Sequence, residues 1–239
     1  MKTLEKITVL LLCVCLLLTV RGGEAAISAG DMAVGTWTTN PRYITFGSWN
    51  GYDLVWRVLD VSTNDADNPD NKTALLLLDD VLRNELGAAE LRYFHSTGDN
   101  DWNGSDIKAF LNSQFLDAFT ADQQADIVTS NYTYGGAYAD NDKTGSSKIF
   151  LLSVDEVTNP QYFSDGDNTG ANADRALSGA AWWLRSPDNT YLAAFVIYSG
   201  AVDSIGIDLY NTLAVRPALK INLSSSDRVI QDVVWLMAK

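Results

Sequence analysis

The chain has 239 residues, of which 46% are hydrophobic, and a formal net charge of −13 near neutral pH. A surface with this excess of negative charge repels phosphate backbones, and no basic stripe interrupts it, which excludes nucleic acid as an expected partner. The 2 cysteines, Cys13 and Cys15, both lie in the first 26 residues, so the rest of the chain offers no disulfide, no cysteine nucleophile and no cysteine-ligated metal.

The first 26 residues have the layout of a secretory signal peptide. Lys2 and Lys6 form a short basic start, the apolar run 7–20 follows, and small residues lead to Ala26. A membrane anchor needs roughly 20 apolar residues, which is more than this run contains. We therefore expect residues 1–26 to be removed and residues 27–239 to form a single domain, secreted or displayed at the cell surface, with no membrane span.

The first predicted elements of the mature chain are strands. Residues 43–47 and 53–61 favour extended backbone, and Asn50 and Gly51 between them are typical of a tight hairpin turn. The continuous apolar run 74–78 predicts a short strand that is buried on both faces.

The clearest helix is predicted at 105–119. Ser105 is a suitable N-cap, and apolar residues then recur at spacings of three and four, which gives one apolar face. Thr120 followed by Gln123 indicates a capping box at the start of a second, short helix that ends near residue 127.

The second half of the chain is predicted to be rich in strands. The stretch 132–147 is rich in Gly, Tyr and Asp and is expected to be a loop, while 149–152 favours a strand and 153–157 a capped helical turn. Four strand-like runs that predict a β-meander follow at 182–184, 193–198, 202–209 and 214–223. Because strands and helices do not alternate strictly, the order favours an α+β fold over a doubly wound sheet.

Two motifs in the last third of the chain carry a family resemblance. They are WWLRSP at 182–187 and VRPAL at 215–219, with weaker matches upstream in WRVLD at 56–60 and FLLS at 150–153. Over residues 43–223 the chain resembles a bacterial family of exported domains of unknown function, which we associate with the C-type-lectin-like fold. That fold is shared with the formylglycine-generating enzymes and with the variable proteins of diversity-generating retroelements.

The resemblance implies a single domain with a C-type-lectin-like α+β fold, built from mixed small sheets, about two helices and a C-terminal β-meander. The framework residues that it implies are Trp182, Trp183, Arg185, Arg216 and Pro217. We expect the two arginines to tie strands together by bonding carbonyls or carboxylates, with capture of a ligand carboxylate as the alternative. Asp188 and Ala214 depart from the pattern, because members of the family carry glycine there. The formylglycine chemistry is not implied, because its cysteines are missing.

In some members of the family, the interval between the two motifs is crowded with asparagine. These members resemble the unmutated template from which a diversity-generating retroelement copies. In this chain the matching positions are Asn189, Thr190, Leu192, Ile197, Asp203, Ser204, Ile205, Ile207, Asp208, Tyr210, Asn211 and Leu213. Adenine-directed mutagenesis of AAY codons gives only NNY codons, which encode no Lys, Gln, Glu, Met or Trp, and residues 186–215 contain none of these five. This absence favours retroelement diversification, although a tight β-meander also disfavours Lys and Glu.

We therefore predict a ligand-binding surface within residues 188–213. This surface includes the twelve positions just named and also Asp188, Tyr191, Phe195 and Tyr198. Tyrosine and asparagine supply contact area and adaptable hydrogen bonds at low entropic cost, as in antibody paratopes. The alternative is an ordinary core segment; Val196 and Val202 are expected to be core, and Phe195 is a candidate for it. Successive side chains of a strand point to opposite faces, so alternate residues would be buried. The sequence does not show which of the following residues these are: Tyr198, Ile205, Ile207 and Leu209.

Other features indicate chemistry less strongly. Residues 99–104 imitate the start of a calcium loop, but Phe110 stands where the closing glutamate is needed, so a helix N-terminus is favoured. The acidic segment 165–168 leaves calcium binding open, and no other cofactor is expected. His95, the only histidine, has no nucleophile or orienting carboxylate nearby in the sequence and is expected to be an ordinary surface or loop residue.

The favoured hypothesis is a binding protein without catalytic residues that displays residues 188–213 towards a protein or glycan. One alternative is a carboxylate-based hydrolase on the same scaffold, for which acidic residues are plentiful but no spacing is diagnostic. The other is a structural cell-surface module whose meander pairs with a neighbouring domain or protomer. The sequence does not select the ligand or the oligomeric state.

Overall fold

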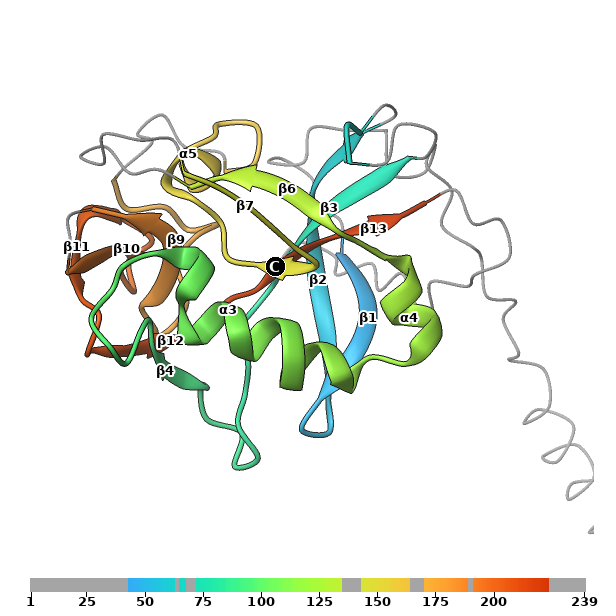
Figure 1. Cartoon of the computed structure of the whole chain (residues 1–239), viewed down its shortest axis with the longest axis horizontal. Coiled ribbons are helices and arrows are strands. Elements are labelled where there is room, and N and C mark those ends of the chain that lie inside the picture. Colours follow the sequence, from blue (N-terminus) through green and yellow to red (C-terminus); the bar gives the residue numbers. More distant parts are fainter. Residues whose placement is uncertain are drawn as a thin grey trace, which may run out of the picture.

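The computed structural model describes residues 43–62, 65–67, 72–134, 143–163, 170–188 and 191–223. The expected signal peptide and the segment 165–168 lie outside these residues, as do Asn189 and Thr190. The described chain forms two larger sheets, a two-stranded hairpin and short helices around a continuous core. This confirms a mixed α+β fold in which strands predominate (Figure 1).

The large sheet has the strand order β1-β2-β3-β13-β5, and β8 also pairs with β13. Its strands are β1 (Tyr43–Trp49), β2 (Tyr52–Ser62), β3 (Thr73–Leu78), β5 (Ile127–Val128), β8 (Ile149–Phe150) and β13 (Ala218–Asn222). The predicted hairpin between β1 and β2 is confirmed, because Asn50 and Gly51 have φ angles of 50° and 83°, as a type I′ turn requires. The prediction for β3 is also confirmed, since every position of that strand is buried.

The small sheet has the strand order β11-β10-β9-β12-β4. Its strands are β4 (Leu91–Tyr93), β9 (Trp182–Pro187), β10 (Leu192–Val196), β11 (Val202–Asp208) and β12 (Thr212–Ala214). Three strands of the predicted meander are confirmed, because β9, β10 and β11 are consecutive antiparallel neighbours. The fourth predicted strand, 214–223, is present in part, but its place in the meander is wrong. β12 ends at Ala214, and β13 begins at Ala218 and belongs to the large sheet.

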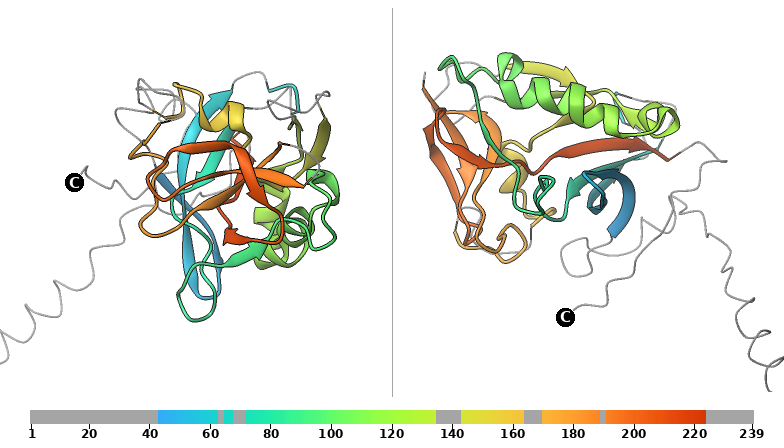
Figure 2. Two further views of the ribbon diagram at one scale, coloured as in Figure 1. Left: turned by 90° about the vertical axis from the view of Figure 1, so that its left-hand side faces the viewer. Right: turned by 90° about the horizontal axis from the view of Figure 1, so that it is seen from below.

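The residues between β12 and β13 cross from one sheet to the other (Figure 2). Pro217 has no N–H for a strand ladder, and its carbonyl accepts a hydrogen bond from the backbone N–H of Leu78 at 2.9 Å. The buried Arg216 side chain donates to the carbonyls of Leu78 and Asp79, at 2.8 and 2.9 Å. These bonds fix the crossover against the end of β3, so the chain leaves the small sheet at this point.

The predicted helix 105–119 is present, but its turns differ in pitch. It begins with α3 (Asp106–Phe110), continues through a wide π-helical turn at Leu111–Phe115, and ends in a tight turn at Leu116–Ala118. Asn112 lies in the wide turn, and its side chain bonds both the carbonyl and the N–H of Ile149, at 2.8 and 3.1 Å. The irregular turn therefore coincides with the place where the helix is tied to β8.

The three described α-helices begin at the caps that the sequence predicts. Ser105 caps α3 through its side-chain oxygen. α4 (Ala121–Asp126) and α5 (Val154–Val157) open with capping boxes at Thr120 and Ser153. In the part of the chain described, no helix combines the length and the apolar character that crossing a membrane requires.

The stretch 132–147 is not the loop that the sequence predicts at either of its ends, and its residues 135–142 lie outside the described part of the chain. It contributes to two paired strands, β6 (Ser130–Thr133) and β7 (Thr144–Ser147). The ring of Tyr132 packs on Phe150, with ring centroids 5.3 Å apart, which holds β6 against the core. A composition rich in Gly, Tyr and Asp does not report such long-range packing, and the tertiary contact outweighs the local preference.

Four tryptophan side chains are completely buried in the core that the two sheets share: Trp56, Trp102, Trp182 and Trp183. The ring of Trp183 meets Phe94 at a centroid distance of 5.6 Å, and its Nε1 donates to the carbonyl of Arg92 at 2.8 Å. β9 is consequently buried along its whole length. It forms a rigid centre from which β10 and β11 extend towards the edge of the small sheet.

Candidate functional site

The predicted surface 188–213 retains access to solvent in the structure. Its exposed members are Tyr191, Tyr198, Ile205, Asp208, Tyr210 and Asn211. Its partly exposed members are Leu192, Ile197, Asp203, Ser204, Ile207 and Leu213. Only Asp188 and Phe195 are buried, which corrects their assignment to the binding face. Most of the predicted residues that the structure describes are therefore available to a ligand.

The position of β11 explains this access. β11 is the edge strand of the small sheet, and none of its residues is buried. The neighbouring β10 is buried from Ala193 to Val196, and Leu209 after β11 is completely buried. Val196 is therefore core, as predicted, whereas Val202 is only partly buried and packs against the core. Buried anchors thus hold an accessible edge.

One end of the β10–β11 hairpin brings two tyrosines together. The N–H of Leu209 bonds the carbonyl of Tyr191 at 3.4 Å, which places Tyr191 and Tyr210 at the same end. Asp208 fixes the turn, because its Oδ1 accepts a hydrogen bond from the Tyr210 N–H at 2.9 Å. Asn211 follows and is exposed. We call Tyr191, Asp208, Tyr210 and Asn211 the tyrosine end.

Tyr198 lies at the other end of the hairpin. β10 runs between Tyr191 and Tyr198, and the extended chain between them covers roughly 20 Å at about 3.3 Å per residue. The turn at Tyr198 packs instead against residues 170–176, where Asn172 N–H bonds the carbonyl of Ser199 at 3.1 Å. The three tyrosines therefore do not form a single patch.

β4 adds two exposed residues to the small sheet that the sequence analysis missed. Leu91 and Tyr93 are 55% and 50% exposed, and Tyr93 pairs directly with Thr212 of β12. The only sequence pattern that could have indicated this strand is the alternation of apolar and charged side chains at Leu91, Arg92 and Tyr93. Three residues are too few for this pattern to predict a strand.

Asp188 lies beneath the surface rather than on it. Its residue is 6% exposed, and its N–H bonds the carbonyl of Leu192 at 3.1 Å. Burial raises the pKa of the Asp188 carboxyl, and the nearby charge of Asp203 raises that pKa further. Asp188 is therefore a buried residue that is hydrogen-bonded to the start of β10.

The framework arginines use their hydrogen-bond donors within the protein. Arg185 donates to both carboxylate oxygens of Glu156, at 2.6 and 2.9 Å, and to the carbonyl of Thr133. Arg216, besides its bonds to carbonyls, lies over the Trp182 ring with 5.0 Å to the centroid. Burial lowers the pKa of Arg216 to about 10, which leaves it protonated near neutral pH. Both arginines are 1% exposed, and their hydrogen bonds tie parts of the fold together.

Comparison with known proteins places the chain in a family. A family model described as a domain of unknown function (DUF6273) matches residues 71–223, which is 153 of the 239 residues. The chain belongs to the DUF6273 family. The match extends from the segment before β3 to the end of β13, so it includes the tyrosine end. No curated protein and no solved structure matches the chain.

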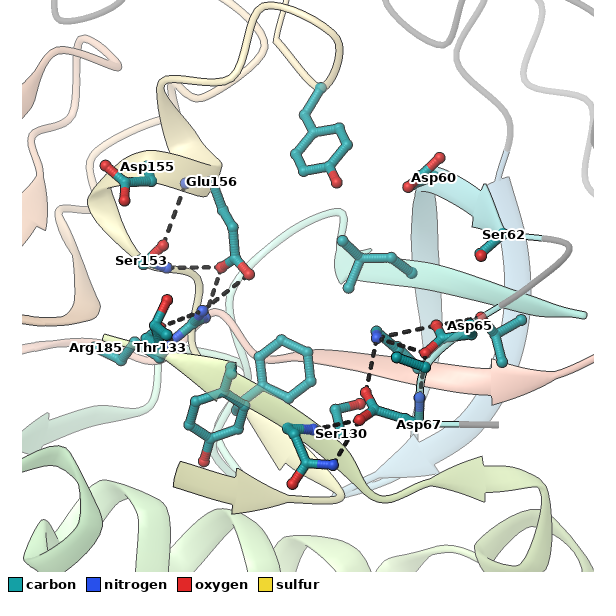
Figure 3. A pocket seen from close by; sticks show the side chains of 18 residues that line it. Asp60, Ser62, Asp65, Asp67, Ser130, Thr133, Ser153, Asp155, Glu156 and Arg185 are labelled. Carbon is teal, nitrogen blue, oxygen red and sulfur yellow. Dashed lines mark hydrogen bonds and ion pairs between the residues drawn. The ribbon is translucent and has the colours of Figure 1, made fainter. Parts of the chain in front are cut away.

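The structure also contains a pocket that the sequence did not predict, lined in part by residues that precede the DUF6273 match. The pocket has a volume of about 590 Å³ and is lined by residues of β2, β3, β6, β8, α5, β9 and β13. Figure 3 shows Glu156 and Arg185 on one side of this pocket and Asp65 and Asp67 on the other. These side chains come from segments far apart in the chain, so no local motif could have revealed the pocket.

An ion-pair cluster forms one side of the pocket. The Lys220 ammonium lies 3.0 Å from Asp65 and 2.9 Å from Asp67. Burial alone would lower the pKa of Lys220, but hydrogen bonds and charges from Asp67 and Asp65 outweigh it and raise that pKa. Burial alone would raise the pKa of Asp65, but hydrogen bonds from Thr73, the Asp67 N–H and Lys220 outweigh it and lower that pKa. Both partners therefore stay ionised near neutral pH.

Proposed function

We propose that this DUF6273 domain is an exported binding protein without catalytic activity. It recognises a protein or glycan through the tyrosine end and the exposed edge of β11. It has a C-type-lectin-like fold, and a retroelement diversifies its binding surface. The fold and the diversification rest on the WWLRSP and VRPAL motifs and on the codon argument given above.

The main support is the accessibility of the positions that adenine mutagenesis would change. Ten of the twelve asparagine-matching positions are described, and none of the ten is buried. Between them lie Ala193, Ala194, Val196 and Leu209, all of which are buried. Random replacement is tolerated on an accessible edge but creates cavities or clashes in a packed core. The accessible and the buried positions are therefore separated in this segment, as a diversified surface requires.

The chemistry of the exposed residues also favours recognition. Tyr191, Ile205 and Tyr210 are 64%, 63% and 57% exposed. Large apolar and aromatic side chains with this exposure are typical of binding sites, and tyrosine combines contact area with a hydroxyl donor. β9 and the buried residues of β10 hold this surface rigidly, so binding would cost little ordering of the backbone.

A carboxylate-based hydrolase is less well supported. Such an enzyme needs a pair of carboxyl groups whose environments separate their pKa values, so that one is an acid and the other a base or nucleophile. In the pocket, Glu156 is held by Arg185, and Asp65 and Asp67 are held by Lys220. Each of these three carboxyl groups is therefore engaged by a cation of the chain, which leaves none of them free to act on a substrate.

The proposal is tested by sequencing the gene and its neighbourhood in many cells of a single population. We expect a near-identical template repeat and a reverse transcriptase gene nearby, with substitutions confined to the positions matching template adenines. Substitutions should then be found at Ile205 and Tyr210 but not at Ala193 or Val196. An even distribution of substitutions over these positions, or the absence of a repeat, would remove the diversification.

A further inference from the structure

We propose that the pocket beside α5 binds a small organic cation that carries a primary ammonium group. This site is separate from the tyrosine end, so it adds a second ligand to the proposed function. The inference rests on the charge of the pocket, on the cations that it already holds and on a buried hydroxyl without a partner.

The lining of the pocket has an excess of negative charge. Its carboxylates are Asp60, Asp65, Asp67, Asp155 and Glu156, and its cations are Arg185 and Lys220, which gives a net charge of −3. A cleft lined by one sign of charge focuses the electric field and raises the local concentration of ions of the opposite sign. The pocket therefore attracts cations and repels anions.

The pocket already accommodates two cations of the chain itself. Lys220 places an ammonium group between Asp65 and Asp67, and Arg185 lies over the ring of Tyr132 with 4.7 Å to the centroid. The two cations compensate part of the negative charge of the pocket lining. Each of them lies on one side of the pocket.

Two carboxylates of the pocket have no cationic partner among the described residues. They are Asp60 near the end of β2 and Asp155 in α5. They lie on opposite sides of the pocket (Figure 3). The side chain of Tyr162 also lines the pocket. Tyr162 interacts with Asp60 and Glu156, and an aromatic ring beside carboxylates suits an organic cation, since its face attracts positive charge.

Ser130 supplies an observation that is independent of charge. Ser130 is 1% exposed and lines the pocket, and its Oγ has no hydrogen-bond partner among the described residues. A buried hydroxyl without a partner is uncommon in folded proteins. An ammonium group has three N–H donors and no acceptor, so it can donate to this oxygen and to carboxylates at the same time.

The same residues do not favour a metal ion or an anion. Across the described ranges, no group of three or more His, Cys, Asp or Glu side chains is arranged to hold a metal. An anion would have to enter a pocket in which both cations are already paired with carboxylates. An organic ammonium needs only hydrogen-bond acceptors and negative charge, and the pocket has both.

The charge requirement is tested by titrating the full mature chain with three small probes in a calorimeter. Putrescine, butanediol and succinate share a four-carbon chain and differ in their end groups, which are cationic, neutral and anionic. We expect putrescine to bind with a Kd of about 1 mM or tighter, and to bind more weakly as salt is added. Butanediol or succinate binding as tightly as putrescine would overturn the proposal, as would no detectable binding of putrescine.

The location is tested with matched variants. The double variant Asp60→Asn with Asp155→Asn should weaken putrescine binding by about tenfold, because it removes two negative charges from the pocket. Glu85→Gln with Asp117→Asn makes the same change in net charge at exposed positions outside the pocket and should leave the Kd unchanged. Equal weakening by both double variants would show that putrescine responds to overall charge, and would overturn the site.

Ser130→Ala separates a ligand contact from a structural role. We expect this variant to weaken putrescine binding by about fivefold while its melting temperature does not fall, because the hydroxyl has no partner to lose. A lower melting temperature with an unchanged Kd would contradict the role assigned to Ser130. Tighter binding of calcium than of putrescine, lost in the Asp60 and Asp155 variant, would replace the organic cation by a metal.

Discussion

At the scale of single residues, the turn after β10 has no room for a side chain. Gly200 has a φ of +83°, and a Cβ at this position would lie 2.0 Å from the carbonyl oxygen of Asn172. The Nε of Arg175 donates to the carbonyl of Gly200 at 2.7 Å, which presses the segment 170–176 against the turn. Glycine is required here both by the backbone angle and by the close approach.

Gly200→Ala should destabilise the fold by about 3 kcal/mol or more, because it combines backbone strain with a clash against backbone. Gly179 is the matched control. It has a similar φ of +77° but nothing within 4 Å of the added Cβ, so Gly179→Ala should cost only about 1 kcal/mol. Urea unfolding of the two variants measures the difference. Equal losses of stability would mean that the turn relaxes away from Asn172.

A second pair of variants compares a core residue with a surface residue within the predicted binding surface 188–213. Val196 is completely buried, and Val196→Ala should lower the free energy of unfolding by about 2 kcal/mol. Ile205 is 63% exposed, and Ile205→Ala should change the free energy of unfolding by no more than about 0.5 kcal/mol. Thermal and urea unfolding check both values. A large loss at Ile205 would place that side chain in the core and count against the binding surface.

At the scale of elements, the Lys220 cluster fastens β13 to the segment 65–67. Lys220→Met should lower the free energy of unfolding by about 3 kcal/mol at neutral pH, because it leaves Asp65 and Asp67 buried without a cation. Lys143 lies 3.8 Å from Asp101 in a more exposed pair, so Lys143→Met should cost less than about 1 kcal/mol. Denaturant unfolding of both variants distinguishes them.

The pH dependence of this cluster has a definite sign. The pKa of Asp65 is lower in the folded chain than its ordinary value, so its pairing contributes stability at pH values above about 4 and loses it as the pH falls through the lowered value. The pKa of Lys220 is raised, so its contribution is present below about pH 10 and is lost above. The difference between the wild type and Lys220→Met should therefore shrink in acid. A difference that grows below pH 4 would contradict the pairing.

The elements that the sequence predicted correctly are those decided by local chemistry. The turn at Asn50 and Gly51, the caps at Ser105 and Thr120, and the buried run of β3 depend on neighbouring residues alone. The wrong predictions depend on distant partners. β6 forms because Tyr132 packs on the core and bonds the Trp102 indole, and 214–223 divides because the buried Arg216 bonds the end of β3.

At the scale of the whole molecule, the two proposed sites have different relations to the sequence. The binding surface lies in one continuous segment, so its motifs and composition could point to it, although the period of two along a strand left the burial of Ile205 and Ile207 open. The pocket joins Asp60, Ser130, Glu156 and Lys220 from separate elements, and only the fold brings them together. Even within the surface, the sequence could not show that Tyr198 lies far from Tyr191, because that separation depends on where β10 begins and ends.

This separation predicts how single tyrosines contribute to binding. For a protein or glycan captured from an array of immobilised bacterial surface proteins and glycans, Tyr191→Ala with Tyr210→Ala should weaken binding by more than about tenfold. Tyr198→Ala removes an equally exposed ring at the opposite end of β10 and should change the Kd by less than about twofold. Surface plasmon resonance gives both values. Loss of binding only with Tyr198→Ala would move the recognition site to the other end of the hairpin.

The place of β13 in the large sheet also governs how this chain can assemble during synthesis. Leu219 pairs with Leu76 on one side and with Ile149 on the other, so a central strand of the sheet leaves the ribosome after nearly all its neighbours. Until it arrives, the flanking strands expose unpaired backbone and apolar faces that invite aggregation. Closing contacts over such long stretches of chain slows folding. The nascent protein should therefore depend on chaperones until β13 is made.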